Sequence, residues 1–192
     1  MARLPGVDPN GLPERARRVL AELERERGFV PNLYLTAANA PHYLPAFAHM
    51  VATTRAESAL PTVLKELVVL EIAKLTRAET MWASHLALAR SAGLSGATIA
   101  CLPTWRGQID SAEHRAVLAL ADEATQNVRV SAETWSVAAA LFDDEQLAEL
   151  VFVIAFYNMV ARILEPLEVD LDPRYATSPV LRSTNDDSRT DG

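Results

Sequence analysis

Two residues with acid–base chemistry, Glu66 and His85, lie on neighbouring apolar segments of this 192-residue chain. A carboxylate on a mostly apolar helix must find a hydrogen-bond partner, because burial without one is costly. An imidazole can exchange a proton near neutral pH. Both groups therefore suit a general acid or base. Two structural alternatives stay open: Glu66 could reach a helix end or a subunit interface, and His85 could be a hydrogen-bonded histidine of the helical core.

The spacing of Glu66 and His85 allows them to meet. If their helices form an antiparallel hairpin that turns at residues 76–78, each residue lies about ten residues from the turn on its own arm. Helical spacing also places Met81 and Trp82 on or beside the face of His85. The sequence thus predicts that Glu66 and His85 are neighbours, without deciding whether their role is catalytic.

The elements that must position this pair are helical. Apolar residues recur at helical spacing nearly everywhere, and no stretch combines strand-like alternation with β-branched enrichment, which predicts an all-α fold of about seven to eight helices. Helices are expected over about 13–28, 41–57, 61–76, 77–93, 95–102, 110–127, from 131 onward, and over 143–164, with a connection over 29–41.

Several helix ends carry recognisable signals. Gly28 and Gly93 occupy the usual C-terminal glycine position. Asp110 with Glu113, and Asp143 with Gln146, resemble capping boxes, and Ser131 is expected to cap the next helix. These signals fix where the predicted helices begin and end.

The composition bounds the organisation of the chain and its partners. No Gly/Ser-rich or Pro-rich joint interrupts residues 1–165, so we expect one domain there and an extended or disordered tail over 166–192. The net charge is −7 and the basic residues are scattered, which argues against nucleic-acid binding and favours small molecules or protein chains as partners.

Redox and membrane chemistry are also constrained. Cys101 is the single cysteine, so no disulfide, cysteine zinc site or dithiol pair can form within one chain, and it is expected to be a small buried hydrophobe. The N-terminus lacks the apolar region of a secretory signal. The apolar run at 147–164 includes Glu149, Asn158 and Arg162, which argues against a bilayer helix. A cytoplasmic location is the expectation.

Self-association is predicted from the helix over 61–76. Its charges, Lys65, Glu66, Glu71 and Lys74, are spread around the helix and form no single polar face, as expected of a helix surrounded by protein. Subunit interfaces can cover apolar helix faces that one domain leaves open. We therefore expect a homo-oligomer.

The run "KELVVLEIAKLTRAETMWASHLALARSAGLS" resembles the core signature of the carboxymuconolactone decarboxylase and alkyl hydroperoxidase D (AhpD) superfamily. Its features are the Glu at 66, the His at 85 in an E-x-x-W-x-x-H context, and the Gly-Leu-Ser helix end. The signature covers about 61–95, the segment 143–164 resembles the last core helix of that family, and the likeness spans about 30–170. It implies an AhpD-like helical bundle that forms homotrimers or homohexamers, with a dimer as a further option.

The resemblance departs from the antioxidant branch of the family. Members with that activity carry a Cys-x-x-Cys pair ahead of the His, and the matching positions here are Ala78 and Met81. A thiol peroxidase reaction cannot start there without a thiolate. Decarboxylase-like sequences often have a Glu before the Trp, where this chain has Met81, so the substrate differs or is undefined.

The resemblance implies a lyase that removes CO2 from a small carboxylated lactone or ring compound, without a metal or an organic cofactor. His85 would donate the proton, and Glu66 would set its tautomer or relay protons. Arg162 is the candidate to bind the substrate carboxylate, with an interface arginine as the alternative. The remaining candidate substrate-binding residues are Trp82, Tyr157, Asn158 and Met81.

Other interpretations stay open. The same pocket could serve a biosynthetic enzyme with another substrate, or the chain could be a non-catalytic oligomeric scaffold. His42 and His49 could reach a pocket from a neighbouring subunit, or they could lie at the surface. His114 is assigned no function.

Overall fold

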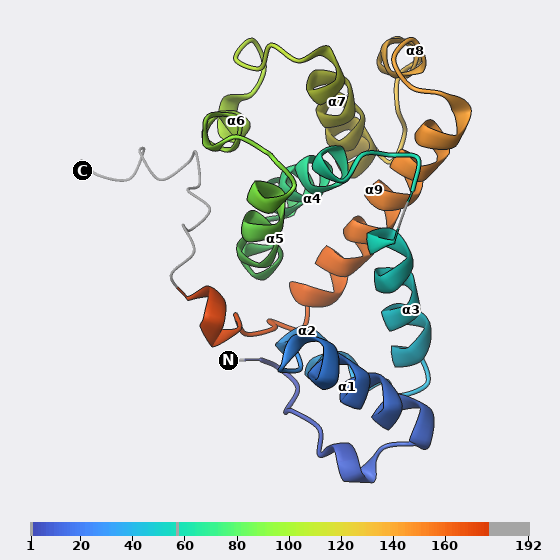
Figure 1. Ribbon diagram of the computed structural model, residues 1–192, viewed down its shortest axis with the longest axis vertical. Coiled ribbons are helices and arrows are strands. Elements are labelled where there is room, and N and C mark those ends of the chain that lie inside the picture. The colour runs from blue at the N-terminus through green and yellow to red at the C-terminus, as the bar shows by residue number, and fades with distance from the viewer. Residues whose placement is uncertain (1, 57, 177–192) are drawn as a thin grey trace, which may run out of the picture. The chain divides into compact units, whose positions relative to one another are not determined.

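A computed structural model describes residues 2–56 and 58–176, and all regular elements within them are helical. The nine α-helices in this part of the chain confirm the all-α fold class. They are α1 (Glu14–Arg27), α2 (Asn32–Ala37), α3 (Leu44–Arg55), α4 (Thr62–Thr76), α5 (Glu79–Ser91), α6 (Gly96–Cys101), α7 (Ala112–Asn127), α8 (Ala132–Ala139) and α9 (Asp144–Leu164), as Figure 1 shows. Three 3-10 helices accompany them: Pro9–Gly11, Leu102–Thr104 and Pro173–Tyr175.

Contacts divide the described chain into two compact units. The first holds the residues up to Ser58 together with Arg162–Ala176, and the second holds Ala59–Ala161. The single domain predicted over 1–165 stays a prediction.

The first unit combines α1, α2 and α3 with the segment after α9. Ala16, Leu20 and Leu23 form the buried stripe of α1, which packs against α3. The segment after α9 belongs to the predicted tail, and its part up to 176 is hydrogen-bonded: the Arg3 amide donates to the carbonyl of Leu167 at 3.0 Å. The rest of that predicted tail, residues 177–192, lies outside the described residues.

The second unit is organised around α4. Every residue from Leu64 to Ala73 is buried, so this helix is surrounded on all sides, as its scattered charges predict. α4 packs against both α5 and α7, which flank it in Figure 1. Because α4 is packed on every side, it is held in one orientation about its axis. The directions of its charged side chains are therefore fixed as well.

Most helix-end predictions are confirmed. Gly28 ends α1 in a left-handed conformation at φ 72°, and Gly93 follows α5 at φ 98°. The Ser131 side chain caps α8. At the start of α9 the Asp143 side chain accepts from the Gln146 amide at 2.9 Å, and the Gln146 side chain accepts from the Asp143 amide at 3.1 Å, which is a complete capping box.

Two local predictions are wrong. The cap of α7 is Ser111, whose hydroxyl accepts from the His114 amide, in place of Asp110. Hydroxyl and carboxylate side chains are both good caps, and the sequence offers two in succession. The expected connection over 29–41 contains the short helix α2, which starts immediately after Pro31. Proline fits that position because its fixed φ precedes a helix well.

Candidate functional site

The hairpin between α4 and α5 brings the two acid–base residues together. α4 ends at Thr76, Arg77 adopts a left-handed conformation at φ 57°, and α5 begins at Glu79. The amide of Ala78 donates to the carbonyl of Ala73 at 2.9 Å and closes the turn. With only two residues between them, the helices must run back antiparallel and pack side by side.

On this hairpin the carboxylate of Glu66 meets the ring of His85. Nδ1 of His85 lies 2.8 Å from Oε2 of Glu66, within hydrogen-bonding distance. The two side chains are 7% and 10% exposed respectively, so the pair is nearly enclosed. This confirms that the residues are neighbours, and it satisfies the carboxylate that α4 buries.

The bond determines what the imidazole can do. A carboxylate opposite Nδ1 favours the tautomer in which Nδ1 carries the proton, because an ionised Glu accepts hydrogen bonds only. Nε2 is then the nitrogen that accepts a proton, or donates one when the ring is protonated. The arrangement is the orienting contact found beside catalytic and metal-binding histidines.

Tyr157 from α9 is the third member of the site. Its ring centroid lies 5.1 Å from that of His85, with the planes at 89°, an edge-to-face contact. Phe156 packs on Tyr157 in the same manner at 5.3 Å. Such contacts favour one ring orientation. The structure therefore places Tyr157 against the ring of His85, and its role in substrate binding stays a prediction.

Met81 and Trp82 lie on α5 one turn before His85 and are buried, at 2% and 7% exposure. The burial of both residues, one helical turn from His85, fits the apolar surroundings that were predicted for His85. Whether they contact a substrate stays a prediction.

Two other predicted substrate-binding residues, Asn158 and Arg162, have surroundings that differ from those of Tyr157. The side-chain amide of Asn158 donates to Oγ1 of Thr125 at 2.9 Å and to the carbonyl of Ile154 at 3.0 Å, which directs it to α7. Arg162 is exposed and belongs to the unit that does not contain Glu66 and His85. Their roles in substrate binding stay predictions.

The other candidate side chains lie elsewhere in the fold. His42 precedes α3 and His49 lies on it, in the first unit. Partial burial lowers the pKa of His114 on α7. Cys101 at the end of α6 is half-buried, less enclosed than expected.

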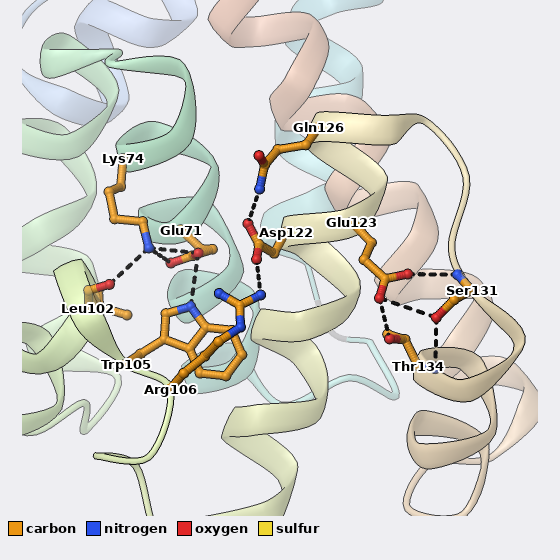
Figure 2. Close-up of polar contacts among 10 residues, drawn as sticks. All are labelled: Glu71, Lys74, Leu102, Trp105, Arg106, Asp122, Glu123, Gln126, Ser131 and Thr134. Carbon is orange, nitrogen blue, oxygen red and sulfur yellow. Dashed lines mark hydrogen bonds and ion pairs between the residues drawn. The ribbon is translucent and has the colours of Figure 1, made fainter.

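A second polar cluster, which the sequence did not single out, lies around Glu71 (Figure 2). Glu71 is fully buried on α4, and its Oε1 accepts from Nζ of Lys74 at 2.7 Å and from Nε1 of Trp105 at 3.1 Å. Lys74 also donates to the carbonyl of Leu102 at 2.8 Å. The contacts fasten the segment after α6 to α4. The only sequence signal for these contacts was the spacing of Glu71 three positions before Lys74.

Burial dominates the electrostatics of this cluster. Desolvation raises the pKa of Glu71, although the neighbouring Lys74 ammonium and the Trp105 donor act in the opposite direction. Oε2 lies 2.7 Å from Nζ of Lys74 without hydrogen-bond geometry, so only one oxygen is satisfied. Beside it, Arg106 stacks over the Trp105 ring at 4.4 Å and pairs with Asp122 of α7.

Within the described residues, no group of three or more His, Cys, Asp or Glu side chains is placed to hold a metal ion. The expectation of cofactor-free chemistry stays a prediction. α9 has the length and composition of a membrane-spanning helix, but half of its most apolar window is buried inside the protein, as in a core helix.

The comparisons with known proteins agree with this fold and signature. Residues 41–123 match the sequence model of the carboxymuconolactone decarboxylase family, a range that includes both Glu66 and His85. Solved structures of AhpD-like proteins share the fold. Over residues 41–123 the chain is similar to the carboxymuconolactone decarboxylase family, and its fold is that of AhpD-like proteins. A comparison with curated proteins gave no match.

Three similar structures cover nearly the whole chain. A peroxidase-related protein of Ralstonia eutropha JMP134 with an AhpD core is 20% identical, with a TM-score of 0.80 over 91% of this chain and 94% of its own. A peroxidase-related protein of Silicibacter sp. TM1040 is 22% identical, with a TM-score of 0.74 over 90% and 92%. The debrominase Bmp8, solved as a cysteine-to-alanine variant with 2,3,4-tribromopyrrole, is 18% identical, with a TM-score of 0.76 over 91% and 96%. At these identities they show the fold alone.

Proposed function

We propose that this protein is a cofactor-independent acid–base lyase that decarboxylates a small carboxylated lactone or ring compound. The observation that carries the proposal is the 2.8 Å contact between Nδ1 of His85 and Oε2 of Glu66, buried inside the α4–α5 hairpin. The matched family contributes the substrate class, since its description names a decarboxylase.

The reaction can be written with these residues. The bond from the ring carbon to the carboxylate breaks, CO2 leaves, and the electron pair enters the conjugated lactone. Protonated His85 returns a proton from Nε2 to carbon, and solvent protonates the imidazole again. Glu66 holds the ring in position and stabilises the imidazolium. Proton transfer from a positioned acid such as His85 contributes about 10²–10⁴-fold. The edge-to-face contact with Tyr157 limits rotation of the ring.

A cation must bind the substrate carboxylate. Lys65 directly precedes Glu66 on α4 and is buried, at 6% exposure. A buried ammonium on the helix that carries Glu66 is a chemically suitable partner for an anion in a medium of low dielectric. We assign it this function beside the sequence-based candidate Arg162. Lys65→Met should raise KM more than it lowers kcat, and Lys65→Arg should restore part of the loss.

Thiol chemistry is the main alternative within this fold. The positions that match the Cys pair hold Ala78 and Met81, and both are buried at 0% and 2% exposure. Cys101 lies on α6, in another part of the unit. A redox function at His85 therefore has no thiolate to use. Hydroperoxide consumption that survives Cys101→Ser would exclude a thiol route altogether.

The test is turnover of a panel of carboxylated lactones, including 4-carboxymuconolactone, followed by absorbance and CO2 release. We expect turnover that His85→Ala abolishes. His114→Ala is the matched control, because it removes a histidine that lies outside the site. If neither protein releases CO2 from any member of the panel, the decarboxylase assignment is wrong. Equal turnover by wild type and His85→Ala would remove His85 as the acid.

A further inference from the structure

The carboxylate of Glu149 on α9 binds the chain immediately before α4. Its Oε2 accepts a hydrogen bond from the Leu60 amide at 2.7 Å, and its Oε1 accepts one from the Ala59 amide at 3.2 Å. Leu60 is buried at 1% exposure, and α4 begins two residues later. Hydrogen bonds to an ionised acceptor are roughly twice as strong as neutral ones. Glu149 therefore ties α9 to the start of α4.

A second side chain of α9 binds the same segment. Nε2 of Gln146 donates to the carbonyl of Ala59 at 3.1 Å, while Oε1 of Gln146 accepts from the Asp143 amide in the capping box. Gln146 and Glu149 are three positions apart, so they are neighbours on the helix surface. Residues 59–60 are thus held by backbone amides and a carbonyl together.

The side of α9 that carries Glu149 also carries Tyr157. Glu149, Val153 and Tyr157 follow one another at intervals of four residues, which places each beside the next along the helix. Val153 and Tyr157 are buried. Glu149 lies about 12 Å from Tyr157 along the axis, at the usual rise per residue. One helix therefore contacts the start of α4 at one point and the ring of His85 at another.

These contacts form a closed loop through the second unit. α4 leads from Leu60 to Glu66, whose carboxylate meets the imidazole of His85. The His85 ring meets Tyr157, and α9 leads from Tyr157 back to Glu149. Because each connection is a helix or a direct side-chain contact, a displacement at Glu149 moves the Tyr157 ring relative to His85.

The opposite side of α9 is open to solvent. Phe152 is 70% exposed and Met159 is 43% exposed. The helices that pack most closely against α4 are α5 and α7. Since solvent cannot hold a helix in place, the position of α9 relative to α4 depends on the contacts of its buried side, and Glu149 makes the charged contact among them.

We propose that Glu149 is a positioning residue of the His85 site: by holding residues 59–60 it keeps the ring of Tyr157 against the imidazole. Glu149 acts through α9 and Tyr157, and it transfers no proton. For its effect on turnover the inference rests on the proposed function. Its structural effect is measured on the protein without substrate, so the two can fail separately.

The matched variants are Glu149→Gln and Glu145→Gln. Glutamine has the shape of glutamate, but its NH2 group would face one of the two backbone amides, a donor against a donor. Glu145 is exposed in the first turn of α9, and its variant removes the same charge. We expect Glu149→Gln to move the ring-proton resonances of His85 toward those of Tyr157→Leu. Glu145→Gln should leave them at the wild-type positions.

Gln146→Glu provides an independent test with the capping box intact. Glutamate at this position still accepts from the Asp143 amide, as in the usual capping box. It places a carboxylate oxygen against the Ala59 carbonyl, where the wild type has a donor. The His85 resonances should move in the same direction as in Glu149→Gln. Circular dichroism checks that each variant is folded, and if Glu149→Gln is not, Gln146→Glu decides the question.

A double variant separates positioning from general destabilisation. If Glu149 acts through the Tyr157 ring, adding Glu149→Gln to Tyr157→Leu should change neither the His85 resonances nor kcat any further, because effects through one contact do not add. On a substrate that turns over, Glu149→Gln alone should lower kcat by up to about 10-fold, the limit expected for Tyr157→Leu.

The outcomes distinguish this inference from the proposed function. Unmoved His85 resonances in folded Glu149→Gln, or effects of the two substitutions that add, would overturn the positioning role. That result would leave the lyase assignment standing if His85→Ala abolishes turnover. Resonances that move as expected in a protein that decarboxylates no member of the lactone panel would support the positioning role and reject the proposed reaction.

Discussion

Nδ1 of His85 on α5 and Oε2 of Glu66 on α4 lie 2.8 Å apart, and this contact joins the two arms of one hairpin. The residues are nineteen positions apart in sequence, but the two-residue turn after Thr76 brings His85 on α5 beside Glu66 on α4. The pair is thus a property of the hairpin. It needs neither a distant loop nor a ligand to form.

Removing the carboxylate should change the tautomer of His85. In the wild type we expect Nδ1 to carry the proton, since the Glu66 carboxylate accepts a hydrogen bond from it. In Glu66→Ala the two tautomers should mix. The nitrogen chemical shifts of the labelled imidazole report this directly. Glu22→Ala, at an exposed position of α1, is the control and should leave the shifts unchanged. An identical tautomer in Glu66→Ala would mean that another group orients the ring.

The ring of Tyr157 should be detectable at His85 without any substrate. Its edge-to-face contact at 5.1 Å shifts the ring-proton resonances of His85 through the aromatic ring current. Tyr157→Leu should remove that shift, and Tyr157→Phe should retain it. On a substrate that turns over, we expect Tyr157→Leu to lower kcat about 2- to 10-fold, the equivalent of one aromatic pair. If Tyr157→Phe is as harmful, the hydroxyl and not the ring is the important group.

The hairpin site could be predicted from the sequence because it is local. The helical spacing, the Gly93 end and the short turn together determine where Glu66 and His85 lie, and the structure confirms their contact. Tyr157 is different, since only long-range packing of α9 against His85 creates its contact. The sequence proposed Tyr157 only as a candidate substrate-binding residue, and its contact with His85 was not predicted.

The Glu71 cluster illustrates what local pattern cannot provide. Lys74 follows Glu71 by three residues, an arrangement that usually marks a solvated helix face. Here Trp105, 34 residues further along the chain, donates a hydrogen bond to Glu71, and the Glu71 side chain is completely buried. Burial of a charged residue depends on which element covers it, and that is decided by the tertiary fold.

The capping box of α9 should contribute measurably to stability. Asp143→Ala removes the acceptor of the Gln146 amide at the start of the helix that carries Tyr157. The cost should be about 1 kcal/mol in the free energy of unfolding, the usual value for a lost cap, measured by urea denaturation. Asp144→Ala, one residue inside the helix, is the control and should cost less. Equal effects would show that helix-end charge matters more than the cap.

The buried Glu71 should make stability depend on pH. Desolvation raises its folded-state pKa above the ordinary value of 4.5, so in the window between these two values the native state binds more protons than the unfolded state. The free energy of unfolding must then fall as the pH rises from about 4.5 through the raised pKa, and level off above it. Glu71→Gln cannot ionise and should lose this dependence.

The measurement is urea denaturation of wild type and Glu71→Gln at several pH values between 4 and 8. The wild type should lose stability relative to the variant as the pH rises, because only the wild type must then bury a charge beside Lys74. Glu123→Gln is the control. Hydrogen bonds from the Ser131 amide and the Thr134 side chain lower the pKa of that exposed carboxyl, so its dependence has the opposite sign and lies at lower pH. A difference between wild type and Glu71→Gln that stays constant over this range would contradict a raised pKa at Glu71, and would show that the Lys74 ammonium and the Trp105 donor outweigh the burial of the carboxylate.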